Sequence, residues 1–354
     1  MPKTLIIRAD ADEKIGIGHI MRCIALAQAW RDKGGKVTFI SICKNDSIIK
    51  RIKEEGFAFI PLQRSCPDPA DLNKVTNIIK RNLKKHRNIW CVLDGYQFDT
   101  IYQRALRSAQ VKLLVFDDYH HLDTYHASII LNQNIGAEKI QYSCDFDTQK
   151  LLGLKYTLLR TEYFDLQKRA HDFTKPVRNL LVTLGGSDSD NTTAKVIGAL
   201  LNPQFKDITV NIVVGPSNPN KMQIYNLVNN SLKNNGELFP NFVIHENANM
   251  PALISSADLS VSAGGSTCWE LCYFGIPFLV IIAAKNQQNI GSGLQVAGAA
   301  RCVGWAKKIS KTKVQKHLAD LIGDANLREN MSKTGSTLID GKGRLRVIQT
   351  MLKL

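Results

Sequence analysis

Short hydrophobic runs alternate with segments of helical periodicity along the first half of the chain. The run Leu5-Ile6-Ile7 is continuous in apolar character, which is typical of a strand buried on both faces of a parallel sheet. Behind it, apolar residues recur at helical spacing until the Gly34-Gly35 pair, a typical helix stop. The predicted strands of this half are 4–8, 36–42, 90–94, 112–117 and 128–132, and the predicted helices are 20–33, 48–55, 74–85 and 102–108. Alternation of this kind predicts an α/β fold with a parallel sheet.

The alternation restarts after Lys175-Pro176, which we expect to end a polar helix over 160–173. Strands are predicted at 179–184, 208–214, 242–245, 258–262 and 277–282, helices at 194–201, 250–256 and 268–274, and helical segments from there to a final helix at 344–354. We therefore expect two Rossmann-like domains, residues 1–174 and 175–354, with a cleft between them.

Gly16-Ile17-Gly18-His19 lies on the predicted turn between the first strand and the first helix. Ligands of open parallel sheets bind at this carboxyl edge, and a helix start offers free N–H groups to an anion. Histidine is the side chain that exchanges a proton near neutral pH, so His19 is a candidate general base. The structural alternative is a histidine that only bonds nearby backbone, and Met21 stands where a dinucleotide motif would have its third glycine.

Two further glycine turns follow strands of the second half. Gly185-Gly186-Ser187 comes after the strand 179–184, and Gly264-Gly265-Ser266-Thr267 opens a helix after the strand 258–262. Such turns let the backbone approach a diphosphate closely. Glu270, one turn into that helix, is suited to accept hydrogen bonds from a ribose diol.

The composition argues against a membrane protein, a secreted protein and a nucleic-acid-binding protein. The chain of 354 residues is 44% hydrophobic and 22% charged, and it has no apolar run long enough for a membrane helix. It opens on a predicted strand where a signal peptide would stand, and its eight cysteines form no C-x-x-C pair, so we expect a cytoplasmic protein. The formal charge of +15 lies in helical stretches without a nucleic-acid motif, which favours attraction of an acidic small substrate over nucleic acid.

Several motifs together resemble a known family. The second half resembles the nucleotide-binding domain of GT-B enzymes related to the UDP-N-acetylglucosamine transferase that completes lipid II. The chain as a whole resembles the UDP-sugar hydrolases of pseudaminic acid biosynthesis. The residues that carry this resemblance are Arg8-x-Asp10, Gly16-x-Gly18-His19, Asp94-x-Tyr96, Phe116-Asp117-Asp118, Leu131-Asn132-x-Asn134, Leu158-Leu159-Arg160 with Glu162, and Gly185-Gly186-Ser187-Asp188.

The resemblance implies a GT-B fold and hydrolysis of UDP-2,4-diacetamido-2,4,6-trideoxy-β-L-altropyranose to UDP and the free sugar, with inversion and without a metal or other cofactor. It implies that His19 activates the attacking water. Either Asp10 or Asp12 is a candidate to orient His19, and Tyr96 is a further candidate at the catalytic site.

The implied substrate contacts are spread over both halves. They are Gly16, Gly18, Arg22, Asn132 and Asn134 in the first half, and Gly185, Gly186, Ser187, Ile244, His245, Gly265, Ser266, Thr267, Glu270 and Gln287 in the second. Ile244 and His245 would read uracil through backbone groups. Near Gln287 the chain departs from the transferases, because Ile290-Gly291 stands near the place where they have an Asn-Ala pair.

Other functions remain open at this point. A glycosyltransferase with a UDP-amino sugar donor, a hydrolysing UDP-sugar epimerase and a non-catalytic UDP-sugar-binding protein all use similar nucleotide domains. His120, His121, Asp123 and His126 have the composition of a metal cluster, but their spacing is not that of a zinc site and we predict none.

Overall fold

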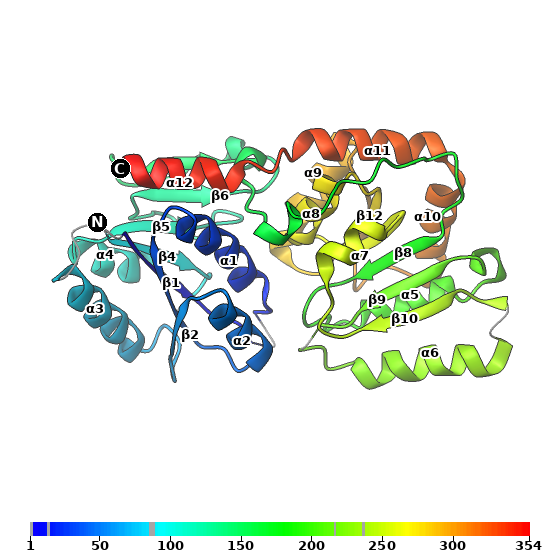
Figure 1. The fold of residues 1–354 in the computed structure, drawn as a ribbon, viewed down its shortest axis with the longest axis horizontal. Coiled ribbons are helices and arrows are strands. Elements are labelled where there is room, and N and C mark those ends of the chain that lie inside the picture. Colours follow the sequence, from blue (N-terminus) through cyan, green and yellow to red (C-terminus); the bar gives the residue numbers. More distant parts are fainter. Residues whose placement is uncertain (1–2, 13–14, 85–88, 216, 236–237) are drawn as a thin grey trace. The chain divides into compact units, whose positions relative to one another are not determined.

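The computed structural model describes residues 3–12, 15–84, 89–215, 217–235 and 238–354 (Figure 1). The chain divides into two compact units. Unit 1 is residues 1–161 together with 341–354, and unit 2 is residues 162–340. Each unit is an α/β layer structure built on one parallel sheet, as the alternation of strands and helices predicts.

Unit 1 contains a seven-stranded sheet in the order β3-β2-β1-β4-β5-β6-β7, and every described pairing in it is parallel. Its strands are β1 (Thr4–Ala9), β2 (Lys36–Ser41), β3 (Ala58–Pro61), β4 (Ile89–Asp94), β5 (Lys112–Phe116), β6 (Ile129–Asn132) and β7 (Gln149–Leu152). Its α-helices are α1 (Gly18–Arg31), α2 (Asp46–Glu54), α3 (Pro69–Leu83), α4 (Thr100–Ser108) and α12 (Gly343–Lys353). Short 3₁₀ turns stand at η1 (Ala137–Lys139), η2 (Leu154–Tyr156) and, at the junction with unit 2, η3 (Thr161–Tyr163).

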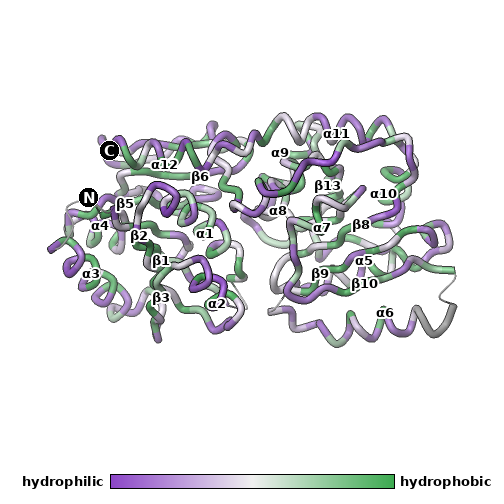
Figure 2. The backbone as a smooth tube through the Cα atoms, in the orientation of Figure 1, coloured by the Kyte–Doolittle hydropathy of each residue, from purple (hydrophilic) through white to green (hydrophobic). Residues whose placement is uncertain are grey.

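The central strands of unit 1 are apolar on both faces because helices cover both faces. All six residues of β1 are buried: Leu5 and Ile7 pack in the core beneath α1, and Ile6 packs in the core beneath α3 and α4. Hydrophobic positions follow the strands, whereas the helices alternate between hydrophobic and polar positions (Figure 2).

Unit 2 contains a six-stranded sheet in the order β10-β9-β8-β11-β12-β13, again parallel in every described pairing. Its strands are β8 (Asn179–Thr183), β9 (Thr209–Val213), β10 (Asn241–His245), β11 (Leu259–Ala263), β12 (Phe278–Ile282) and β13 (Arg301–Trp305). Its helices are α5 (Thr192–Leu200), α6 (Lys221–Asn235), α7 (Met250–Ser256), α8 (Thr267–Phe274), α9 (Gln288–Ala297), α10 (Lys311–Gly323) and α11 (Ala325–Leu338), with 3₁₀ turns η4 (Pro203–Phe205) and η6 (Lys285–Gln287). Among the described helices, none is both long enough and apolar enough to span a membrane.

Two sequence-based expectations for unit 2 are wrong. The polar helix expected over 160–173 is a single 3₁₀ turn, η3, followed by irregular chain. Apolar residues recur in this segment at helical spacing at Tyr163, Leu166 and Ala170, but of these three only Tyr163 is buried, so the helical propensity has no packing to support it. The stretch after β12 is not purely helical, because β13 adds an edge strand to the sheet.

The predicted division into residues 1–174 and 175–354 differs from the compact units at the boundary between the domains and at the C-terminus. The change of unit falls at 161/162, and the final helix α12 belongs to unit 1. Val347, Ile348 and Met351 of α12 are buried in the same core as α1. The helix starts at Gly343, where a Cβ would lie 2.1 Å from the Thr157 carbonyl oxygen, so only glycine fits this close approach.

Met351→Ala tests this docking of α12. The side chain is 1% exposed, and its truncation leaves a cavity, so we expect the free energy of unfolding of unit 1 to fall by about 2–5 kcal/mol. Met222→Ala on α6 is the matched control, because Met222 is 70% exposed. Urea unfolding followed by tryptophan fluorescence measures both variants. Equal stability of the two would contradict the assignment of α12 to the core of unit 1.

Candidate active site

His19 lies in the first turn of α1, at the carboxyl edge of the unit 1 sheet. The chain reaches it through Gly16, whose φ of +74° is left-handed and therefore favours glycine. The His19 side chain is 11% exposed, so it is not completely buried.

Asp94 fixes the orientation and tautomer of His19. The Nδ1 atom of His19 lies 2.5 Å from Oδ1 of Asp94, the last residue of β4, which pairs with Ala9 of the neighbouring β1. Burial on its own would raise the pKa of Asp94, but the Arg22 guanidinium and His19 outweigh it and lower that pKa. The ionised carboxylate only accepts hydrogen bonds, so Nδ1 is the donor and Nε2 carries the free lone pair of the neutral ring.

Arg22 connects two carboxylates from neighbouring strands. Its guanidinium donates two hydrogen bonds of 2.6 Å to Asp94 and bonds of 2.8 and 3.0 Å to Asp118, which follows β5. The same group lies 4.7 Å from the centre of the Phe116 ring. Arg22 Nη2 is also 3.2 Å from Nδ1 of His19, but both atoms carry hydrogens, so this is a contact and not a hydrogen bond.

Asp118 accepts hydrogen bonds from two further side chains besides Arg22. The Tyr96 hydroxyl donates to it at 2.6 Å, and the Asn134 side-chain amide donates at 2.8 Å. Burial raises the pKa of Asp118, but the charge and hydrogen bonds of Arg22, with His19 and the Tyr96 bond, lower it on balance. The Tyr96 ring stands edge-on to His19, with the centroids 5.3 Å apart. The structure therefore brings His19, Arg22, Tyr96 and Asn134 into one connected group.

The expectation that Asp10 or Asp12 orients His19 is wrong. Asp10 is 2% exposed and bonds Arg8, the Ile42 N–H, Ser65 and Gln97, whereas Asp12 accepts a bond from the Ile15 N–H at 2.6 Å. Arg8 and Asp10 are two residues apart in extended chain, so their side chains share one face, and that face carries α3 and α4 instead of α1.

Asn132 also lies outside the group around His19. It is completely buried, its amide donates to the Tyr142 hydroxyl at 2.9 Å, and its carbonyl oxygen accepts from the Asn134 N–H at 3.1 Å. Its described bonds are therefore all to the protein, and it shapes the loop that carries Asn134.

Sequence reasoning missed the roles of Asp94 and Asp118. A signal was present, because both the strand 90–94 and the strand 112–117 end in acidic residues. This pattern does not reveal the order of the strands in the sheet. The acids lie beside His19 because β1, β4 and β5 are neighbours in that order. No group of three or more His, Cys, Asp or Glu side chains within the described ranges is arranged to hold a metal ion.

The first glycine turn of unit 2 follows β8. Gly185 has a φ of +91°. A Cβ on Gly215, which follows β9, would lie 2.3 Å from the Gly186 carbonyl oxygen, so the chain after β9 packs directly against the backbone of this glycine turn. Asp188 accepts from the N–H groups of Thr192 and Thr193 at 2.8 and 2.9 Å and thereby caps α5. Ser187 is half-buried at the same edge.

The second glycine turn follows β11 and leads into α8. Gln287 holds this turn: its Oε1 accepts from the N–H groups of Gly264 and Ala283 at 3.2 and 2.9 Å. Gly265, Ser266 and Thr267 are partly exposed at the helix start, whereas Glu270 is only 6% exposed. The structure thus gives Gln287 a role in shaping the turn.

Ile244 and His245 belong to β10, the edge strand of the sheet of unit 2. Val214 donates its N–H to the His245 carbonyl, so the backbone of His245 faces β9. Parallel pairing alternates along a strand, and the N–H and C=O of Ile244 therefore point away from β9. The His245 side chain bonds Asn211 through Nε2 at 2.8 Å.

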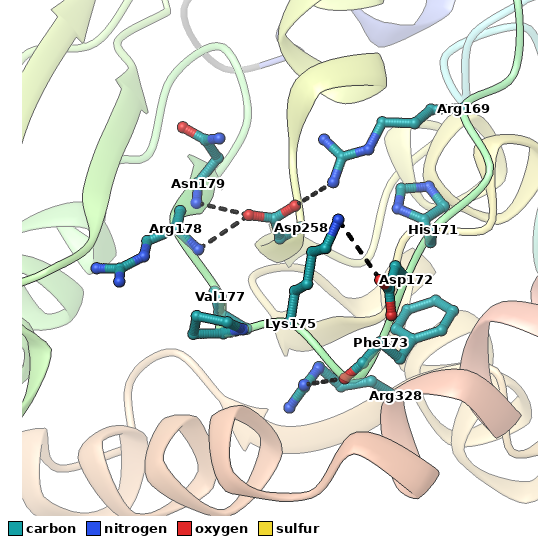
Figure 3. Close-up of a pocket in the computed structure, with 11 residues that line it drawn as sticks. Arg169, His171, Asp172, Phe173, Lys175, Val177, Arg178, Asn179, Asp258 and Arg328 are labelled. Carbon is teal, nitrogen blue, oxygen red and sulfur yellow. Dashed lines mark hydrogen bonds and ion pairs between the residues drawn. The ribbon is translucent and has the colours of Figure 1, made fainter.

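A pocket of about 340 Å³ lies at the opposite, amino edge of the same sheet (Figure 3). Asp258 stands beside it and bonds Arg169 at 2.7 Å and the N–H groups of Arg178 and Asn179 at 2.9 Å each. Because Asn179 begins β8, this pocket is separate from the glycine turns, which follow the carboxyl ends of β8 and β11.

Comparison with known protein families finds a match in the second half of the chain. Residues 179–345 match the glycosyltransferase family 28 C-terminal domain. This match covers most of unit 2, including both glycine turns and Glu270.

Three relatives match most of the chain. The Methanocaldococcus jannaschii protein MJ1062 is 26% identical over 99% of this chain, which spans 66% of that protein. The Bacillus subtilis spore coat polysaccharide biosynthesis protein SpsG is 23% identical over 96% of this chain and 95% of its own. The UDP-2,4-diacetamido-2,4,6-trideoxy-beta-L-altropyranose hydrolase of Campylobacter jejuni is 24% identical over 83% of this chain and 97% of its own. The resemblance to the hydrolases of pseudaminic acid biosynthesis is thereby confirmed.

Solved structures establish the fold class. MurG of Acinetobacter baumannii superposes with a TM-score of 0.66 at 15% identity and covers 100% of both chains. Anabaena HepE in complex with UDP-glucose gives a TM-score of 0.63 at 13% identity and covers 99% of this chain and 100% of its own. With its two parallel α/β units, the chain has the GT-B fold, as the resemblance implied.

The carboxylates of unit 1 give a testable dependence of stability on pH. Burial raises the pKa of Asp117, but bonds from His121, Tyr142 and the His120 N–H bring it down to about 2. A carboxyl with a depressed pKa stabilises the fold above its unfolded pKa near 4, and this contribution is lost as the pH falls toward 2. We expect a loss of about 2 kcal/mol from Asp117 over this range.

Asp117→Asn should therefore flatten the decrease in the free energy of unfolding between about pH 4 and 2. Asp123→Asn, at an exposed position of the same loop, is the control. Urea titrations at a series of acidic pH values measure this slope. An unchanged slope in Asp117→Asn would show that Asp117 does not carry the effect.

Proposed function

We propose that this protein is a UDP-sugar hydrolase that releases UDP and 2,4-diacetamido-2,4,6-trideoxy-L-altropyranose in the biosynthesis of pseudaminic acid. The similarity to the Campylobacter jejuni hydrolase along most of the chain supports the substrate, and the family 28 domain supports a nucleotide-sugar ligand. The observation that carries the reaction type is the His19–Asp94 pair, which leaves a neutral imidazole nitrogen free to accept a proton.

In the proposed reaction, Nε2 of His19 removes a proton from water as the water oxygen bonds to the anomeric carbon. The bond from that carbon to the diphosphate oxygen breaks on the opposite face, and UDP leaves with the bonding electrons. The anomeric centre is inverted. Asp94 stabilises the imidazolium that forms, and Arg22 keeps Asp94 ionised and in place.

We propose that unit 2 binds UDP through backbone groups. Gly185, Gly186 and Ser187, with Gly265, Ser266 and Thr267, would hold the diphosphate with N–H and hydroxyl donors. Glu270 would accept hydrogen bonds from the ribose hydroxyls. The outward N–H and C=O of Ile244 suit the acceptor and donor on the pairing edge of uracil. No metal ion enters this proposal, because helix N-termini and backbone donors supply the positive field.

A second candidate is a glycosyltransferase with a UDP-amino sugar donor and an acceptor other than water. The family 28 match favours it, as does the name of SpsG, a spore coat polysaccharide biosynthesis protein. Incubation of the protein with UDP-diacetamido sugars in water alone, followed by NMR, separates the two. Free sugar with an unchanged skeleton supports hydrolysis, whereas no turnover until an acceptor is added supports transfer.

His19→Asn tests the general base. Asparagine places its amide where Nδ1 of histidine lies and so keeps a bond to Asp94, but it has no proton acceptor at Nε2. We expect turnover to fall by about 10²–10⁴-fold, while UDP affinity stays within about threefold, a change of under 1 kcal/mol. Coupled release of UDP measures the first and calorimetry the second. Near-normal turnover would remove His19 from the mechanism.

Glu270→Ala tests the ribose contact. Loss of hydrogen bonds to the diol should weaken UDP binding by about 1–3 kcal/mol. Calorimetry with UDP in the presence of a chelator measures this for the variant and for Glu54→Ala, a control at an exposed glutamate of unit 1. Unchanged affinity in Glu270→Ala would refute the ribose contact, and a large loss of wild-type affinity in chelator would refute metal-independent binding.

A further inference from the structure

Three histidines of unit 1 form pairs of the same kind with aspartates. Nδ1 lies 2.5 Å from a carboxylate oxygen in His19–Asp94, 2.5 Å in His121–Asp117 and 2.6 Å in His126–Asp145. Each pair leaves Nε2 on the far side of the ring. The surroundings of the three Nε2 atoms differ, and the difference indicates what each histidine does.

Asp117 determines the tautomer of His121. Besides His121, it accepts the Tyr125 hydroxyl at 2.9 Å, the Tyr142 hydroxyl at 2.6 Å and the His120 N–H at 2.7 Å. A carboxylate with this many donors stays ionised, so it accepts from Nδ1–H of His121. Neutral His121 therefore carries its lone pair on Nε2.

The Nε2 atoms of His126 and His121 have opposite environments. In His126, Nε2 accepts a hydrogen bond of 2.9 Å from Nε of Arg104, which completes a structural role. In His121, Nε2 is buried and has no hydrogen-bond partner among the described residues. Buried polar atoms in native proteins are almost always paired, so this acceptor calls for a partner that the described residues do not supply.

His121 is also a neighbour of His19. The Tyr96 ring stands edge-on to both histidines, with centroid distances of 5.3 Å to each. Asp94 and Asp117 follow β4 and β5, which are adjacent in the sheet. Half-buried Tyr119 packs beside both rings, with its ring centroid 6.0 Å from that of His121 and 5.0 Å from that of Tyr96.

We propose that Nε2 of His121 accepts a hydrogen bond from an acetamido N–H of the substrate sugar, and that His121 is thus a specificity-determining residue beside the base. This inference rests on the proposed function for the identity of the sugar. In its UDP-linked form, a 2,4-diacetamido-2,4,6-trideoxy sugar presents an amide N–H at C2, an amide N–H at C4 and a single hydroxyl at C3. An amide N–H only donates, and it therefore matches a lone pair that has no other donor.

Asparagine and glutamine at position 121 separate the two ring nitrogens. His121→Asn keeps a donor to Asp117 but removes the acceptor at Nε2, whereas His121→Gln places an amide oxygen near the Nε2 position. We expect KM to rise about tenfold or more in His121→Asn, with kcat within about threefold, and His121→Gln to recover part of the loss. His126→Asn is the matched control and should leave both constants unchanged.

Substrate analogues identify the partner of Nε2. Replacing either acetamido group by acetoxy removes the N–H and changes the shape little. The wild type should lose about tenfold in kcat/KM with one of the two analogues, and His121→Asn should show no further loss with that analogue. Equal constants for His121→Asn and His126→Asn with the diacetamido substrate would overturn the proposal.

NMR of ¹⁵N-histidine-labelled protein tests binding without turnover. The resonance of His121 Nε2, assigned by its absence in His121→Asn, should be that of an unprotonated nitrogen and should shift when the UDP-diacetamido sugar is added. Hydrolysis without this shift would overturn the role of His121 and leave the proposed function intact. A shift without hydrolysis would support the role of His121 in sugar binding and refute the proposed function.

Discussion

The ion pairs of Arg22 with Asp94 and Asp118 are the constraint on which the rest of unit 1 depends. All three side chains are buried, and a buried charge is stable only when opposite charges and hydrogen bonds surround it. Arg22 lies on α1, Asp94 is the last residue of β4, and Asp118 follows β5. The ion pairs therefore fix the start of α1 against the carboxyl ends of two strands, and Asp94 also bonds His19, one helical turn before Arg22.

A second buried arginine fixes β1 from its other face. Arg8 bonds Asp10 and Asp71, and the Tyr102 hydroxyl donates to Asp71 at 2.8 Å, which connects β1 to α3 and α4. Its guanidinium lies 5.0 Å from the centre of the Phe98 ring. The Arg8-x-Asp10 motif thus stabilises β1 from the face opposite to α1 and His19. A strand fixed on both faces gives the glycine turn and His19 a rigid base, which positioning of a reactive group requires.

Unit 2 reaches its arrangement by different means. Its two glycine turns are shaped by close backbone packing at Gly186 and Gly215 and by the Gln287 side chain, with few buried charges. Backbone N–H groups suit a diphosphate because their positions do not depend on side-chain rotamers or on protonation. The buried charged side chains concentrate in unit 1, where the proposed function needs proton transfer.

The class of fold could be predicted from the sequence, and so could four residues that the structure brings together in the candidate site: His19, Arg22, Tyr96 and Asn134. Apolar runs bounded by glycine turns predicted the strands, and the acids at the ends of β4 and β5 were visible as a pattern. Only the tertiary structure decided that Asp94, and not Asp10, orients His19, and that Nε2 of His121 has no described partner whereas that of His126 does. It also decided that α12 packs in unit 1. The reason is that the order of parallel strands and the docking of a helix depend on contacts between residues far apart in the chain, which no local pattern encodes.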